Sequence, residues 1–163
     1  MKTKAVHKYV TFILDKIKFG IEVLKTREIV EYGRITPMPE APEYINGVIN
    51  LRGNVVPVVD LMNKFFQMKT KIESTTSIMI VEPLIDTEKT MMGIIVDTVT
   101  DVLEIKPDLM GKTPKYGSNL KSEYIKNVAC VNEEFIMILD IDHVMAHIEI
   151  KEDLSAMLQK QPA

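Results

Sequence analysis

The sequence is poor in cysteine, in aromatic residues and in excess positive charge, and it has no tryptophan. A single cysteine, Cys130, cannot form an internal disulfide, and its apolar setting (VACV) predicts a buried, inert thiol. A net charge of −3 and an isoelectric point near 5.7 argue against nucleic acid as a partner, because nucleic-acid binders usually present a basic face to phosphates.

Long apolar runs are missing too. None approaches the roughly 18 residues of a membrane span, and the first residues, MKTKAVHKYV, lack the apolar segment of a signal peptide. We therefore expect a cytoplasmic protein with no direct membrane insertion.

Catalytic motifs are absent as well: the sequence has no Gly-x-Ser-x-Gly elbow, P-loop or dinucleotide fingerprint. Asp97 with Asp101, and Asp140 with Asp142 and His143, could form acid and base pairs. However, Asp140 corresponds to Asp60 in an earlier, similar segment of the chain, and this favours a structural role for both. His143 and His147 have the spacing of two metal ligands on one helical face but lack a third ligand motif. We expect no enzymatic activity, no cofactor and no metal site.

What the sequence does have is a high apolar content, 46% of 163 residues, arranged mostly with the two-residue period of β-strands. This composition predicts one globular domain with a sizeable core. The predicted strands cover 9–14, 18–23, 45–51, 55–60, 77–81, 91–96, 99–105, 124–131 and 135–141.

Other segments are predicted as connectors or helices. A short helix is expected at 61–66, and 23–31 fits either a helical turn or a strand. Three prolines make 36–42 an extended connector. Loops are expected at 82–90 and 107–121, and a partly helical end at 142–158.

The chain contains two versions of one unit. FGIEV at 19–23 matches MGIIV at 92–96 at an offset of 73, and YINGVINLRGNVVPVVDL at 44–61 matches YIKNVACVNEEFIMILDI at 124–141 at an offset of 80. Chance similarity among β-rich segments is the alternative, but glycine, aromatic and acidic positions agree as well as apolar ones. The two halves, about 8–68 and 76–149, therefore predict two small β-barrels, either one from each half or with strands exchanged between them.

Positions that differ between the copies are free to serve function. At the turn, Asn50 to Asn54 (NLRGN) corresponds to CVNEE in the second copy, and Gly47 corresponds to Asn127. By contrast, Gly20 and Gly93 occupy equivalent strand positions, which predicts a bulge or a close backbone approach.

Three motifs in order, FGIEVLKTREIVEY, INGVINLRGNVVPVVDL and MMGIIVDTVTDVLEI, resemble the CheW family of bacterial chemotaxis adaptors. The resemblance covers roughly 8–149, leaving 150–163 as a tail. It implies an all-β fold of two five-stranded SH3-like β-barrels packed around a shared hydrophobic core. The implied function is a non-catalytic adaptor that couples chemoreceptor cytoplasmic tips to the regulatory domain of the histidine kinase CheA, in receptor arrays at the membrane.

Carried over residue by residue, the family's receptor contacts fall on Glu28, Ile29, Asn50 and Arg52, with Gly47 and Gly53 shaping the region. A groove between two barrels suits the recognition of a helical receptor tip. On the residues alone, Glu28 and Arg52 also fit ordinary solvated charges. The resemblance assigns no kinase-binding residues, and Asn127 departs from the glycine that relatives often carry there.

Two further functions remain as alternatives: an adaptor of the same fold in a non-chemotactic pathway, and a small-barrel oligonucleotide binder. The low aromatic content of 6% and the acidic charge count against the second. The eleven methionines divide into predicted core residues (Met79, Met91, Met92, Met137) and candidates for an adaptable contact surface (Met38, Met62, Met68).

Overall fold

The computed structural model describes residues 7–111 and 122–146 and consists mainly of β-strands. The strands are β1 (Lys8–Leu14), β2 (Ile17–Glu22), β3 (Thr26–Glu31), β4 (Ile45–Leu51), β5 (Asn54–Asp60), β6 (Ser77–Val81), β7 (Leu84–Ile85), β8 (Glu88–Lys89), β9 (Met92–Val96), β10 (Thr98–Glu104), β11 (Met110–Gly111), β12 (Ile125–Val131) and β13 (Glu134–Leu139). The helices are α1 (Leu61–Phe66) and α2 (Ile141–Ala146), with 3-10 turns η1 (Val23–Lys25), η2 (Pro107–Leu109) and η3 (Ser122–Tyr124).

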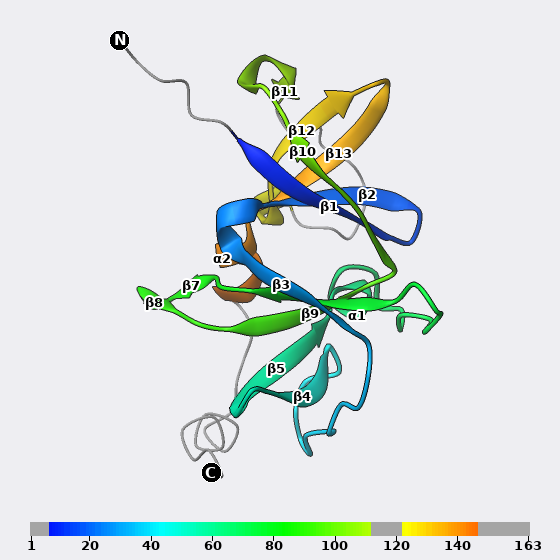
Figure 1. The fold of residues 1–163 in the computed structure, drawn as a ribbon, viewed down its shortest axis with the longest axis vertical. Coiled ribbons are helices and arrows are strands. Elements are labelled where there is room, and N and C mark those ends of the chain that lie inside the picture. Colours follow the sequence, from blue (N-terminus) through cyan, green and yellow to red (C-terminus); the bar gives the residue numbers. More distant parts are fainter. Residues whose placement is uncertain (1–6, 112–121, 147–163) are drawn as a thin grey trace.

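These strands form two main sheets, one above the other in Figure 1. Sheet A has the order β10-β1-β2-β13-β12-β11, and sheet B has the order β3-β6-β9-β5-β4. Each sheet contains strands from both halves of the chain, because the chain crosses from sheet A to sheet B at η1 and returns between β9 and β10. The predicted all-β class is confirmed, and where two five-stranded units were expected, sheet B has five strands and sheet A has six.

The repeat seen in the sequence reappears in the pairing of strands. In sheet A, β13 runs parallel to β2 with Ile138 opposite Gly20, and in sheet B, β5 runs parallel to β9 with Val58 opposite Gly93. Both glycines allow a close approach, as predicted: an added Cβ would lie 3.0 Å from Ile138 Cδ1 at Gly20 and 2.9 Å from Ile78 Cγ2 at Gly93.

Central strands such as β6 and β9 are apolar on both faces, because each face packs against a different hydrophobic cluster. In β6, Met79 and Val81 face a cluster shared by both sheets, whereas Ile78 and Ile80 face a cluster inside sheet B. Sheet A has its own inner cluster, which includes Ile136 and Ile138. Side chains therefore alternate along each such strand: one face of the sheet contributes to the shared core, and the other face contributes to the cluster that belongs to that sheet alone.

Most element predictions are confirmed, including the helix at 61–66, and the ambiguous segment 23–31 forms both a 3-10 turn and a strand. The predicted loop at 82–90 is wrong in part, since it contains the β7–β8 hairpin, and η2 and β11 lie in the predicted loop at 107–121. Residues 112–121 and 147–163 lie outside the described part, so the predictions there stay predictions.

The prediction of a buried Cys130 is wrong: its side chain is exposed. Its neighbour Ala129 takes the inward position on β12, and period-two alternation turns Cys130 outward, opposite the exposed Phe135. The prediction of Met62 as part of a contact surface is also wrong: Met62 lies on α1 and is buried in the shared cluster. Met79 and Met92 are fully buried, and Met91 and Met137 pack against the clusters from partly exposed positions.

Candidate functional site

The turn that distinguishes the two copies is a tight hairpin between β4 and β5. Arg52 and Gly53 occupy its two central positions with φ angles of 50° and 87°, the pattern of a type I′ turn. The Asn50 side chain stabilises the turn, because its Oδ1 accepts a hydrogen bond of 2.9 Å from the Gly53 backbone N–H. Arg52 is thereby presented to solvent on a rigid tip, with its side chain 67% exposed.

Arg52 is paired with Glu28 of β3, through Nη2 and Oε2. In the pairing order of sheet B, β3 is one outer strand and β4 is the other, so the contact brings opposite edges of the sheet together. A second link has the same effect, since Thr36 in the connector after β3 exchanges two backbone hydrogen bonds of 2.9 Å with Val48 of β4. Sheet B therefore curls strongly, and the curl assembles the Glu28–Arg52 pair.

The ion pair shifts the titration of its acidic member. The hydrogen bond from Arg52 lowers the pKa of the Glu28 carboxyl, slight burial opposes this shift, and the positive charges of Arg52 and Arg27 add to the lowering. At neutral pH both side chains are charged. The same contact raises the pKa of Arg52.

An NMR titration of the side-chain carboxyl should give a pKa for Glu28 below its ordinary value of about 4.3. Because the folded pKa is lowered, the pair stabilises the fold above that value, and this contribution is lost as the pH falls through the folded pKa. In Arg52→Ala the pKa should rise toward the ordinary value. An unchanged Glu28 pKa in that variant would show that the pair does not persist in solution.

Ile29 and Gly47 play different parts in this region. Ile29 follows Glu28 on β3 with 49% of its surface exposed, but it pairs with Met79 whereas Glu28 pairs with Ile80, so it lies on the opposite face of β3 from the ion pair. Gly47 is buried, at a φ of +146°, and an added Cβ would lie 2.1 Å from the Thr36 carbonyl oxygen. Gly47 therefore leaves the space in which the connector at Thr36 packs against β4. Its counterpart Asn127 sits at the same irregularity in the β12–β13 register but with an ordinary negative φ.

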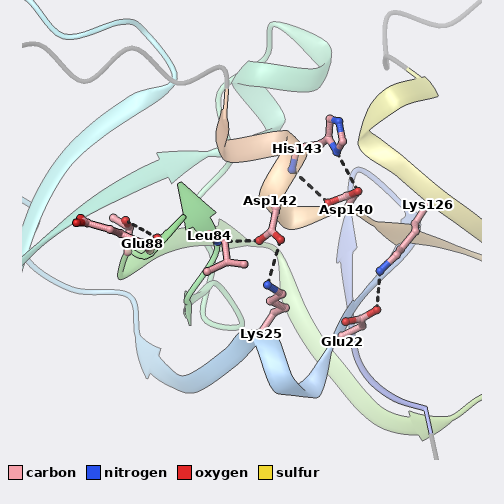
Figure 2. Close-up of polar contacts among 9 residues, drawn as sticks. Glu22, Lys25, Leu84, Glu88, Lys126, Asp140, Asp142 and His143 are labelled. Atoms are coloured by element: carbon pink, nitrogen blue, oxygen red, sulfur yellow. Dashed lines mark hydrogen bonds and ion pairs between the residues drawn. The ribbon is translucent and has the colours of Figure 1, made fainter. Parts of the chain in front are cut away.

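Three of the acidic residues considered for catalysis, Asp97, Asp140 and Asp142, make contacts that hold elements of the fold together. Figure 2 shows Asp142, at the start of α2, accepting hydrogen bonds from Lys25 Nζ at 3.0 Å and from the Leu84 backbone N–H at 2.8 Å. Asp140 precedes α2, accepts from the His143 backbone N–H at 3.2 Å and lies 3.0 Å from its Nδ1. These contacts tie η1, the β7–β8 hairpin and α2 together at the junction of the sheets.

The predicted parallel between Asp140 and Asp60 is confirmed in these contacts, because both carboxylates accept from the first turn of the helix that follows. Asp97 accepts a backbone hydrogen bond from Asp15. Within 7–111 and 122–146, no cluster of three or more potential ligands could hold a metal ion, and His147 lies outside these ranges.

Sequence reasoning missed the exposure of Leu24, which lies four positions before Glu28 in the chain. Leu24, in η1, is 93% exposed. A signal was present in the sequence: Phe19, Ile21 and Val23 set the inward phase of the strand, and Leu24 falls on the outward phase.

Comparison with known proteins identifies the family to which this chain belongs. The family model of the CheW-like domain, which describes the sequences of that family, matches residues 8–149 of this chain. The chain belongs to the CheW family. It is 30% identical over 142 residues to the chemotaxis protein CheW of Klebsiella aerogenes, with 87% of this chain and 83% of the relative covered. It is 27% identical over 143 residues to the CheW of Treponema pallidum, covering 88% and 84%.

A solved structure supports the same assignment. The scaffolding protein TtCheW from Thermoanaerobacter tengcongensis superimposes with a TM-score of 0.77 at 30% identity, over 91% of this chain and 92% of that one. The chain is thus a chemotaxis adaptor of the CheW type, from a family whose members are scaffolds. Among the described residues, no helix is long and apolar enough to cross a membrane.

Proposed function

We propose that this chain couples chemoreceptor cytoplasmic tips to the regulatory domain of the histidine kinase CheA, and that the Arg52 turn makes the receptor contact. The observation that carries the proposal is the exposed Glu28–Arg52 pair on a rigid hairpin. An adaptor of this kind holds its partners in a fixed geometry and needs no catalytic group. Its recruitment to receptor arrays would follow from the same contacts.

The chemistry of the pair suits a helical partner with acidic or amide groups. A guanidinium carries five N–H donors in a planar fork, so Arg52 can keep Glu28 on one edge and bind a partner oxygen with the other. Because Glu28 already fixes the side chain, less conformational freedom is lost when a partner binds.

Charge reversal at Arg52 tests the receptor contact. Arg52→Glu should weaken binding to a chemoreceptor cytoplasmic fragment about tenfold or more, because it removes the donors and places a second carboxylate beside Glu28. Isothermal titration calorimetry would measure the affinity, and circular dichroism would check the fold. Lys71→Glu is a matched control, since Lys71 is 89% exposed and lies outside the pair.

The swapped pair Glu28→Arg with Arg52→Glu separates two roles. It restores an ion pair but moves the guanidinium from the hairpin tip to β3, so receptor affinity should stay low. Unchanged affinity in Arg52→Glu would remove Arg52 from the contact. The coupling function itself would be contradicted if the unaltered protein, at micromolar concentration, captured neither a receptor fragment nor the kinase regulatory domain.

A further inference from the structure

Leu24 is displayed to solvent to an unusual degree. Among the described residues, the large hydrophobic side chains that are exposed include Leu24 at 93%, Phe135 at 68%, Val102 at 62% and Ile29 at 49%. Leucine is one of the residue types most often buried, and a single exposed leucine is ordinary on a mobile loop. Leu24, however, lies on a short turn that is fastened on both sides.

The residues around Leu24 hold the η1 turn in place. On one side, Val23 packs against the shared core, and its carbonyl oxygen accepts hydrogen bonds from the Thr26 backbone N–H and, at 2.8 Å, from Thr26 Oγ1. On the other side, the Lys25 carbonyl accepts a hydrogen bond of 2.8 Å from the Glu82 backbone N–H. The backbone thus has few ways to turn the leucine inward.

The Lys25 side chain adds a third constraint. Its Nζ lies 3.0 Å from Asp142 Oδ2, and the other oxygen of Asp142 accepts from the Leu84 N–H, as Figure 2 shows. Lys25 is therefore drawn toward α2 and the β7–β8 hairpin. An apolar side chain presented in a fixed position loses little conformational entropy when a partner covers it, which is the property of an interface anchor.

We propose that Leu24 is an apolar anchor for the same helical receptor tip that contacts Arg52 and Glu28, so this inference rests on the proposed function. The argument is continuity: Glu28 is four positions after Leu24 in the chain, so their Cα atoms lie at most about 14 Å apart. One helical hairpin can span that distance. Leu24 would enter an apolar pocket on the tip while the Arg52 pair fixes its orientation.

Replacing the leucine by a polar residue of similar size tests the anchor. Leu24→Gln should weaken binding to a chemoreceptor cytoplasmic fragment about tenfold, because the buried apolar area is lost. Binding to the kinase regulatory domain should be unchanged, and so should the thermal unfolding midpoint. The conservative Leu24→Met should keep most of the receptor affinity.

Leu109→Gln is the matched control: Leu109 is also an exposed leucine in a 3-10 turn, but it lies in η2, beside β11 of sheet A. Unchanged receptor affinity in Leu24→Gln, with Arg52→Glu still defective, would overturn the anchor and leave the proposed function standing. A loss of kinase binding alone would also overturn it and would assign Leu24 to the kinase. If the unaltered protein binds no receptor fragment, the proposed function fails, and the anchor fails with it.

Discussion

Gly47→Ala should lower the free energy of unfolding by about 3 kcal/mol or more, measured by urea denaturation. The new Cβ would lie 2.1 Å from the carbonyl oxygen and 2.7 Å from the carbonyl carbon of Thr36, both backbone atoms that cannot rotate away. The φ of +146° adds strain for any residue with a side chain. The connector would have to leave the edge of β4.

Gly53→Ala is the control for this prediction. Gly53 also has a positive φ, +87°, but no atom lies within 4 Å of the added Cβ, so only the backbone strain of about 1 kcal/mol remains. If Gly47→Ala and Gly53→Ala lower the free energy of unfolding by the same amount, the close approach of Thr36 to β4 is not the reason why position 47 requires glycine. Receptor binding by Gly47→Ala would need to be measured under conditions where the variant is folded.

The second large effect is expected at Asp60, the buried carboxylate before α1. Asp60→Ala should cost about 2–4 kcal/mol in urea denaturation, because four hydrogen bonds lose their acceptor. Two come from the backbone N–H groups of Met62 and Asn63, and two come from the Thr70 backbone and hydroxyl, the last at 2.6 Å. Thr70 and Asp60 are both buried, so water cannot easily replace the lost contacts.

The internal repeat supplies the control for Asp60. Asp140→Ala changes the equivalent position, where the side chain is 27% exposed and contacts the backbone N–H and the Nδ1 of His143. Its cost should be about 1 kcal/mol or less, since water can reach the donors. Equal losses in the two variants would mean that the burial of Asp60 with Thr70 adds nothing to its role as a helix cap.

The pattern of apolar residues was sufficient to predict most of the fold. In β1 and β2, period-two alternation and a polar turn determine a hairpin whose partners, such as Phe12 and Phe19, meet as the pattern requires. The β7–β8 hairpin was missed because its strands are two residues long, too short to show a period, and because β8 contains only charged side chains. Cys130 and Met62 were misplaced because an apolar setting does not say which face a residue occupies.

The candidate site was only partly predictable. Arg52 and Gly53 are marked in the sequence, because a glycine at the second place of a two-residue loop favours a type I′ turn. The sequence also pointed to Glu28 as a neighbour through the CheW resemblance. It could not show that the connector pairs with β4 through Thr36, and that pairing explains why Gly47 must be glycine.

The sequence by itself determined the strands, the duplication and the family, because these depend on local periodicity and on motifs that each lie within one segment. The tertiary structure alone decided how the halves share strands, which residues face solvent and which charges meet. The physical reason is that these features depend on contacts between residues far apart in the chain. Glu28 and Arg52 belong to opposite edges of a curled sheet, and Lys25, in the η1 turn that carries Leu24, is bound to Asp142, more than a hundred residues away.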